Sequence, residues 1–365
     1  MNEIKLLFII DNLGAGGAQN QLTLLAGELD KKGYPITIVT YYPQQFFNYR
    51  LVNTNINHVQ LSKKGTMGIG IIYSLLKLIR QNKYSHIISF LDTPNFYNVL
   101  TNWLSGQKSK TIISYRSKTD INNLNRTNKR IKEWVNKQAL FIISNSHHER
   151  LRWQKSYPAL AYKWHTIYNA VDPKMIPVEN VKKNEFLVVG SIGPDKNALV
   201  IIEALHLLNQ SNQPISITWI GQSFPSQMKY ADYHNEMLQK IDEYQLNDLW
   251  HWQEPTAHIA EEYSKYKALI LASKTEGLPN VVCEALYCGL PCIVSNVLDH
   301  PKIVQDDKTG FLFDPDNAAE LREVLSKMYS MDDNKYESMC KEAKKQASEL
   351  FGIKDFVQQY EKLLS

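Results

Sequence analysis

The sequence predicts an α/β protein of two doubly wound domains, each built on a parallel sheet with helices on both faces. Three observations lead to this prediction. The chain of 365 residues is too long for one ordinary core and suits two domains. Short apolar runs alternate with amphipathic segments, as in parallel strands joined by crossover helices. Two such series are separated by residues 171–184, which contain Pro173, Pro177 and a run of charge but no hydrophobic period, so an interdomain linker is expected there.

The composition is that of a globular protein, with 44% hydrophobic and 21% charged residues. Residues 1–11 have one lysine before a short apolar run and no small-residue cleavage site, so they predict a first strand and no signal peptide. The longest apolar candidate, residues 67–79, is too short to span a bilayer and contains Lys77. The four cysteines form no C-x-x-C pair and predict structural free thiols. A cytoplasmic location is expected, with peripheral binding to the inner face of the plasma membrane left open.

In the first series, each predicted strand is a short apolar run and each predicted helix is amphipathic. The strands are expected at residues 4–10, 36–40, 86–90, 111–115 and 140–145. The helices between them are expected at residues 19–32, 69–81 and 126–138. Strand and helix alternate, so the strands are expected to run parallel in one sheet.

The second series repeats this pattern and then ends in helices. Its strands are expected at residues 186–189, 215–220, 249–252, 268–271 and 292–294. Its helices are expected at residues 198–210, 227–245, 258–266, 281–287, 318–329, 336–350 and 353–364. Ligands of such sheets bind at the carboxyl ends of the strands, so two domains that face each other across a cleft are expected.

The segment from Ser273 to Ser295 is the most informative part of the chain. Glu276 and Glu284 stand eight positions apart, and the turn residues Gly277 and Pro279 between them predict the start of a short helix. Helical rise separates the two carboxylates by something on the order of 10 Å. The free N–H groups of a helix start hold phosphate. This arrangement matches a nucleotide sugar. The first carboxylate would face the sugar hydroxyls, the helix start would bind the diphosphate, and the second carboxylate would face the ribose hydroxyls.

A glycine-rich loop, residues 11–19, follows the first predicted strand. Glycines let the backbone approach a ligand closely, and the helix start is an anion site. A dinucleotide site would need glycine where Gln19 stands and a carboxylate after the second strand, where residues 41–45 have none. Close approach to another ligand and a plain tight turn stay open as interpretations.

The corresponding loop of the second series, residues 190–197, contains Lys196 near a helix start. A lysine there can neutralise a diphosphate leaving group, and a solvated loop lysine is the structural alternative. Asp314 and Asp316 have the D-x-D spacing of some metal-dependent sugar transferases. Asp316 precedes a predicted helix and is expected to cap it, so no catalytic metal is predicted.

The stretch between Lys108 and Lys155 is strongly basic, with twelve Lys or Arg against three acidic residues. Its predicted helix, residues 126–138, places Ile131 and Trp134 on one face and basic residues around the rest. Such a helix suits an anionic membrane surface or a phosphorylated acceptor, and an ordinary surface helix is the alternative. No nucleic-acid-binding module is visible, so nucleic acid is not expected as a partner.

Taken together, these residues resemble the retaining glycosyltransferases of family four, which have the GT-B fold, over nearly the whole chain. Glu276 to Glu284 reproduces the family's Glu-seven-residues-Glu signature within S-x-x-E-G-L-P-x-x-x-x-E-A. Residues 14–19 (G-A-G-G-A-Q) are similar to the family's N-terminal glycine loop. Residues 194–197 (P-D-K-N) resemble the stretch that carries its phosphate-binding lysine, and residues 169–172 (N-A-V-D) resemble its domain junction. The resemblance implies domains at residues 1–172 and 173–350, with a last helix at 351–365 that crosses back to the first domain.

The resemblance also implies an activity: transfer of a hexose or N-acetylhexosamine from a nucleotide sugar, UDP-linked, with the anomeric configuration retained. The implied acceptor is a glycan, or a glycan on a polyprenyl diphosphate, in bacterial surface polysaccharide assembly, and no cofactor is implied. The expected catalytic residues are Glu276, Lys196, Arg116 and Asp92. The expected donor-binding residues are Gly16, Gly17, Gly190, Gly277, Leu278, Asn280 and Glu284.

Three positions depart from the family's pattern. Ser191 stands where the family usually has an arginine that faces the diphosphate. Arg116 stands near the end of a strand where many members have a histidine, and it cannot act as a general base at neutral pH. Lys302 replaces a common glutamate. A non-catalytic partner protein with the same fold is therefore one alternative function, and a nicotinamide-dependent oxidoreductase is another.

Overall fold

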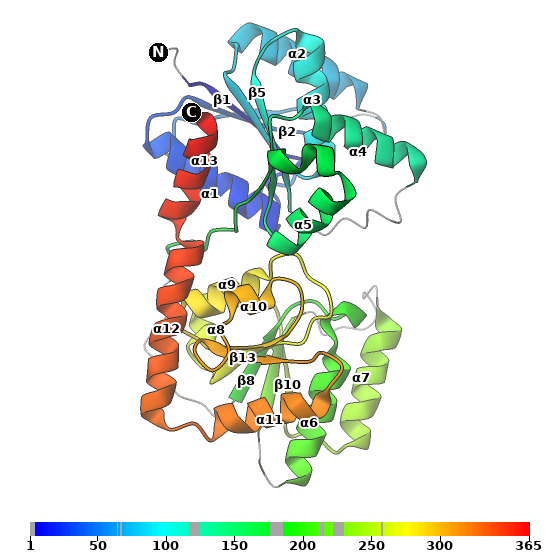
Figure 1. Ribbon diagram of the computed structural model, residues 1–365, viewed down its shortest axis with the longest axis vertical. Coiled ribbons are helices and arrows are strands. Elements are labelled where there is room, and N and C mark those ends of the chain that lie inside the picture. The colour runs from blue at the N-terminus through cyan, green and yellow to red at the C-terminus, as the bar shows by residue number, and fades with distance from the viewer. Residues whose placement is uncertain are drawn as a thin grey trace. The chain divides into compact units, whose positions relative to one another are not determined.

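The computed structural model describes residues 4–63, 65, 68–116, 125–175, 185–211, 213, 215–221, 230–256 and 258–365. The chain divides into two compact units, whose elements are labelled in Figure 1. Unit 1 comprises Met1–Ala170 and Ile353–Ser365, and unit 2 comprises Val171–Gly352. Most of the predicted linker (residues 176–184), the first residues of one predicted helix (227–229) and part of the basic stretch (117–124) lie outside the described residues.

Among the described residues, unit 1 contains a seven-stranded parallel sheet in the order β3-β2-β1-β4-β5-β6-β7. Its central strands are buried along their whole length, as expected for a parallel sheet covered on both faces. The strands are β1 (Leu6–Ile9), β2 (Ile36–Thr40), β3 (Asn57–Gln60), β4 (His86–Phe90), β5 (Lys110–Tyr115), β6 (Phe141–Ser144) and β7 (Trp164–Thr166). The helices are α1 (Gly17–Lys31), α2 (Ile69–Asn82), α3 (Asp92–Ser105), α4 (Arg126–Gln138) and α5 (His147–Ser156), with 3-10 turns η1 (Phe46–Arg50) and η2 (Pro158–Lys163).

Unit 2 contains, within its described part, a six-stranded parallel sheet in the order β10-β9-β8-β11-β12-β13. Its strands are β8 (Glu185–Val189), β9 (Ser216–Ile220), β10 (Trp250–Gln253), β11 (Ala268–Leu271), β12 (Cys292–Ser295) and β13 (Gly310–Phe313). Its helices are η3 (Pro194–Lys196), α6 (Ala198–Gln210), α7 (Ala231–Glu243), α8 (Ile259–Tyr263), α9 (Asn280–Tyr287), α10 (His300–Ile303), α11 (Ala318–Tyr329) and α12 (Asp333–Phe351). Two parallel sheets with crossover helices confirm the predicted fold class.

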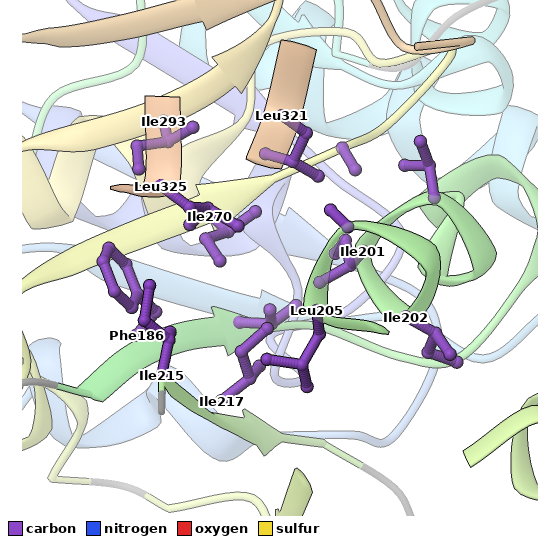
Figure 2. Close-up of a cluster of buried hydrophobic side chains, with 14 of the residues drawn as sticks. Phe186, Ile201, Ile202, Leu205, Ile215, Ile217, Ile270, Ile293, Leu321 and Leu325 are labelled. Carbon is purple, nitrogen blue, oxygen red and sulfur yellow. The ribbon is translucent and has the colours of Figure 1, made fainter. Parts of the chain in front are cut away.

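The core of unit 2 fixes the strand ends at which a ligand would bind. Figure 2 shows Phe186, Ile217, Ile270 and Ile293, one from each of four neighbouring strands, with side chains of α6 and α11 around them. All four side chains are fully buried. Protein interiors of this kind are close-packed and resist deformation, so the loops that follow these strands start from a rigid base.

Helix α3 is the main element that the hydrophobic pattern does not predict. Its residues include several asparagines and threonines, which are poor helix formers. The structure buries two of these asparagines against the sheet: the Asn95 amide donates to the Ser114 carbonyl (3.1 Å), and the Asn98 amide donates to the Ile87 carbonyl (3.0 Å). Tertiary hydrogen bonds therefore stabilise a helix that its own propensity does not favour.

The last helix, α13 (Ile353–Leu364), belongs to unit 1 although it follows unit 2 in sequence. It lies beside α1, as Figure 1 shows, and buries Phe356 and Tyr360 in the core of unit 1. Arg116 joins the helix to the sheet: one guanidinium nitrogen donates to Asn169 Oδ1 (2.7 Å), and another donates to the Tyr360 hydroxyl. The guanidinium also lies over the Phe90 ring, 4.2 Å from its centroid.

Removal of the Tyr360 hydroxyl is expected to destabilise the protein. Tyr360→Phe keeps the contacts of the ring with Phe90 and Phe356 but leaves one donor of Arg116 without its acceptor. The expected loss in the free energy of unfolding is about 1 to 3 kcal/mol, measured by urea denaturation. Tyr73→Phe is the matched control, since Tyr73 is 72% exposed. Equal stability of the two variants would contradict the assigned role of this hydroxyl.

Candidate active site

In unit 2, the order of strands reverses between β8 and β11, and the predicted donor site lies at their carboxyl ends. Gly190 directly follows β8, and Lys196 ends the 3-10 turn in the same loop. Glu276 lies in the loop after β11, and Glu284 lies inside α9, which that loop enters. Four residues predicted from two separate motifs are thus brought to one edge of one sheet.

A cavity of about 430 Å³ opens at this edge, with mainly apolar walls. It lies entirely within unit 2, and Gly190 and Glu284 are two of its lining residues. Ligand pockets of this kind combine apolar walls with a few polar groups that fix orientation. The remaining lining residues are Val189, Ser191, Ile220, Gly221, Pro255, Thr256, Ile259, Tyr263 and Val281.

Glu284 is the acidic group of this cavity. Its Oε2 accepts a hydrogen bond from the Tyr263 hydroxyl (3.1 Å), which comes from α8. Burial raises the pKa of Glu284 to about 7, and the bond from Tyr263 opposes this shift. The carboxyl group therefore changes its charge near neutral pH, and it can accept hydrogen bonds from two adjacent hydroxyls when it is ionised.

Lys196 and Glu276 form an ion pair beside the cavity, between Nζ and Oε1. The same Oε1 also accepts a hydrogen bond from the Ser273 hydroxyl (3.0 Å). Both side chains are partly exposed, at 25% for Lys196 and 19% for Glu276. No described residue makes a hydrogen bond or ion pair with Oε2 of Glu276, so this oxygen is the one that can accept from a ligand.

Gly190 connects the cavity to the ion pair. Its backbone has φ +151°, a conformation that favours glycine, and a Cβ placed there would lie 3.4 Å from Cε of Lys196. The next loop approaches it closely, because a Cβ at Gly221 would lie 2.1 Å from the Gly190 carbonyl oxygen. A larger residue at position 190 would therefore have a strained backbone and would contact the Lys196 side chain.

The start of α9 supplies the predicted phosphate-binding groups. The helix begins at Asn280, and Pro279 at its N-cap offers no side-chain hydrogen bond to the first turn. The chain bends at Gly277 and Leu278 before it enters the helix. Leu278 is buried, and Gly277 is partly exposed. The N-terminal end of a helix is suited to an anion.

In unit 1, the predicted glycine loop joins β1 to α1 and is held by its own side chains. Asp11 Oδ1 accepts from the Gln19 amide (2.9 Å), and Asn12 Oδ1 accepts from the Gly14 amide (2.6 Å). A Cβ at Gly16 would lie 2.2 Å from Gln19 Oε1, so a larger residue there would require the Gln19 side chain to move. Gly17 is the first residue of α1.

The two other candidates from unit 1 already have partners. Asp92, at the start of α3, pairs with Lys132 (2.5 Å) and is 54% exposed. Arg116 is bound to Asn169 and Tyr360, as described above, and burial lowers the pKa of its guanidinium. These contacts give Arg116 a structural role, and its predicted part in catalysis stays a prediction.

Sequence reasoning did not find the apolar wall of the cavity or the tyrosine that contacts Glu284. Part of the wall comes from the loop after β10 (Pro255 and Thr256) and from α8 (Ile259 and Tyr263), outside the glutamate signature. The predicted cap of α11 was wrong, because the Asn317 side chain caps this helix, and Asp316 pairs instead with Lys274 (2.5 Å). Among the described residues, no group of three or more His, Cys, Asp or Glu side chains is placed to hold a metal ion.

Comparison with known proteins gives matches to both halves of the chain. Residues 15–175 match the family described as Glycosyltransferase Family 4, and residues 174–346 match the family described as Glycosyl transferases group 1. The two matches meet within a few residues of the boundary between units 1 and 2.

Relatives and solved structures extend these matches. A Campylobacter jejuni protein named GalNAc-alpha-(1->4)-GalNAc-alpha-(1->3)-diNAcBac-PP-undecaprenol alpha-1,4-N-acetyl-D-galactosaminyltransferase is 24% identical, over 99% of this chain and 98% of its own. An Escherichia coli UDP-Gal:alpha-D-GlcNAc-diphosphoundecaprenol alpha-1,3-galactosyltransferase is 30% identical over 37% of this chain and 34% of its own. The backbone is similar to that of Anabaena HepE, solved in complex with UDP, with a TM-score of 0.84, 17% identity and 99% of both chains covered.

Proposed function

This chain belongs to glycosyltransferase family four and has the GT-B fold, and from that premise we propose that it transfers a sugar from a UDP-sugar to a lipid-linked glycan acceptor. The observation that carries the proposal is the row of groups along one edge of unit 2. Glu284 and Gly190 line the cavity, Lys196 lies beside Gly190, and Glu276 is paired with Lys196. This row fits the ribose, the diphosphate and the sugar of one nucleotide sugar.

Each group has a proposed role that follows from its chemistry. Ionised Glu284 binds the ribose hydroxyls, and the apolar walls of the cavity enclose the base. Lys196 and the first turn of α9 stabilise the charge that develops on the leaving diphosphate. Glu276 orients the donor sugar through Oε2. Because Lys196 supplies a fixed positive charge, we expect transfer to continue in EDTA.

The donor and the acceptor are proposed from the relatives. HepE was solved with UDP, and the Escherichia coli relative is named as a UDP-Gal enzyme. Both named transferases form alpha linkages onto undecaprenol-linked glycans. An alpha linkage made from an alpha-linked nucleotide sugar requires that the configuration is retained. The proposed product is therefore an alpha-linked hexose or N-acetylhexosamine on a bacterial surface glycan.

A thermal-shift screen of UDP-, GDP- and ADP-sugars tests the donor. UDP and UDP-sugars are expected to raise Tm by several degrees at 100 times Kd, where ligand linkage contributes about 2.7 kcal/mol. Product analysis by NMR with the best donor then gives the configuration of the new bond. Stabilisation by GDP or ADP alone would contradict the proposed base, and a beta-linked product would contradict retention.

We also propose that unit 1 binds an anionic membrane surface through exposed residues of α3 and α4, together called the α3–α4 face. It consists of Trp103, Leu104, Arg126, Lys129, Arg130 and Ile131, all of them exposed. Trp103 is 62% exposed and packs edge-on against Trp134. Its three basic residues have no ion-pair partner among the residues that the structure describes, so their charge is available to lipid headgroups. None of the described helices has the length and apolar character to cross a bilayer.

Vesicle flotation tests the α3–α4 face. Reversal of charge in the double variant Lys129→Glu/Arg130→Glu is expected to lower binding to anionic vesicles by at least about thirty-fold, since the two basic residues together contribute about 2 kcal/mol. Lys132 is left unchanged because its side chain is 13% exposed and pairs with Asp92. Lys341→Glu/Lys345→Glu, on the exposed face of α12, is the matched control. Equal binding by the two double variants would count against this surface.

A further inference from the structure

A chain of hydrogen bonds runs behind Glu276, away from the cavity. Nδ1 of His300 donates to the Ser295 carbonyl oxygen (2.8 Å), and the Ser295 hydroxyl donates to the Ser273 carbonyl oxygen (2.6 Å). The Ser273 hydroxyl then donates to Oε1 of Glu276 (3.0 Å). Ser273, Ser295 and His300 are fully buried. Because β11 and β12 are adjacent parallel strands, their carboxyl ends lie side by side, and the chain of bonds links these two ends.

The protonation of His300 follows from its partner. A carbonyl oxygen only accepts, so Nδ1 carries the proton and Nε2 of the neutral ring has a lone pair. Burial lowers the pKa of His300, and this effect outweighs the hydrogen bond to the Ser295 carbonyl and the charges of Glu276 and Asp299, which raise it. Nε2 is buried, and no described residue makes a hydrogen bond with it. A buried acceptor without a partner is unfavourable, so stability alone gives no reason for an imidazole here.

We infer that Ser273, Ser295 and His300 are positioning residues that fix which oxygen of Glu276 faces the donor sugar, an inference that rests on the proposed function. Lys196 and Ser273 both engage Oε1, which leaves Oε2 for the ligand. Ser273 can hold Oε1 only if its own backbone is fixed. The Ser295 hydroxyl fixes the Ser273 carbonyl, and His300 fixes the Ser295 carbonyl. Three side chains that do not contact the cavity thus determine the rotation of the carboxylate that does the binding.

Ser273→Ala tests the last bond of this chain. With the donor identified by the screen, kcat is expected to fall about ten-fold, as for the loss of one hydrogen bond to a charged group. The Kd for UDP, which has no sugar, is expected to stay within two-fold of the wild-type value. In a Glu276→Ala background, which removes the acceptor of the Ser273 hydroxyl, the same substitution is expected to have no further effect on kcat, because coupled residues are not additive. Equal loss in both backgrounds, or a parallel loss of UDP affinity, would overturn the inference.

His300 allows a test by two conservative variants. The amide nitrogen of asparagine takes the place of Nδ1, and that of glutamine takes the place of Nε2. His300→Asn is therefore expected to keep kcat within about three-fold of wild type, whereas His300→Gln is expected to lower it about ten-fold. Equal activity of the two variants would overturn the role of Nδ1.

An NMR spectrum of ¹⁵N-histidine-labelled protein provides a readout that does not depend on activity. It is expected to show His300 as the Nδ1–H tautomer at pH 7, and an Nε2–H tautomer would overturn the assignment. The proposed function and the positioning network would be rejected by different results. No turnover of any nucleotide sugar by the wild type would reject the proposed function, whereas an active wild type with an equally active Ser273→Ala variant would reject only the positioning network.

Discussion

Lys196→Met is expected to lower kcat about 10²- to 10³-fold, the loss seen when one fixed donor to a developing negative charge is removed. Lys196 provides a positive charge beside Gly190 at the edge of the cavity. Ser191, where the family usually has an arginine, provides none. Methionine has a similar length and no charge, so the variant isolates the electrostatic contribution. Steady-state kinetics with the donor from the screen measures the effect.

The matched control is Lys274→Met. Lys274 lies two residues before Glu276 but is 49% exposed and pairs with Asp316 at 2.5 Å. An exposed ion pair contributes little, so this variant is expected to keep kcat within two-fold of wild type. A similar loss of kcat in both variants would mean that general charge near the cavity matters more than the position of Lys196. Full activity of Lys196→Met would contradict the proposed role directly.

Glu284→Gln is expected to weaken UDP binding about ten-fold or more above pH 7 and, at the same pH, to stabilise the free protein. Below pH 4.5, wild-type Glu284 is protonated in the folded and unfolded states alike. As pH rises from 4.5 to about 7, the unfolded chain loses this proton first, so the free energy of unfolding falls. Above pH 7 this loss in the free energy of unfolding is constant, at most about 3 kcal/mol. Glutamine has no charge to bury and can still accept from the Tyr263 hydroxyl.

Thermal melts at pH 5 and pH 8, with and without UDP, measure both effects. The gain in Tm of Glu284→Gln over wild type, without ligand, is expected to be larger at pH 8. Glu236→Gln on the exposed face of α7 is the control and is expected to leave Tm and UDP affinity unchanged. A gain that does not depend on pH would contradict the raised pKa of Glu284. Unchanged UDP affinity would contradict its ribose-binding role.

The sequence predicted the fold through its strands, because a buried parallel strand is a short apolar run wherever it occurs. β2, β4, β11 and α6 lie at the predicted residues. Helix α3 was not predicted, because its stability comes from asparagines that bond to strand backbones and so depends on tertiary structure. β13 was not predicted, since its four residues begin with a glycine and are followed by a turn-forming Asp-Pro.

The residues of the candidate site likewise include some that the sequence predicted and some that it did not. Lys196, Glu276 and Glu284 each follow a recognisable local pattern, and the fold brings them to one sheet edge. Tyr263 and His300 have no such pattern, because each acts through a partner on another element of unit 2. Arg116 shows the opposite case. A charged residue after a strand resembles a site residue in sequence, and only the fold shows that Tyr360 from α13 binds it.

The discontinuity of unit 1 has a consequence for synthesis on the ribosome. Its sheet is complete by Ala170, yet part of its core comes from Phe356 and Tyr360, which are translated after the whole of unit 2. Domains generally fold in the order in which they emerge from the ribosome. Here unit 1 emerges first but can complete its core only after α13 has emerged. During that interval the apolar side of α1 and the guanidinium of Arg116 lack their native cover. Unit 2 can therefore complete its core before unit 1, although its residues are translated later than the sheet of unit 1.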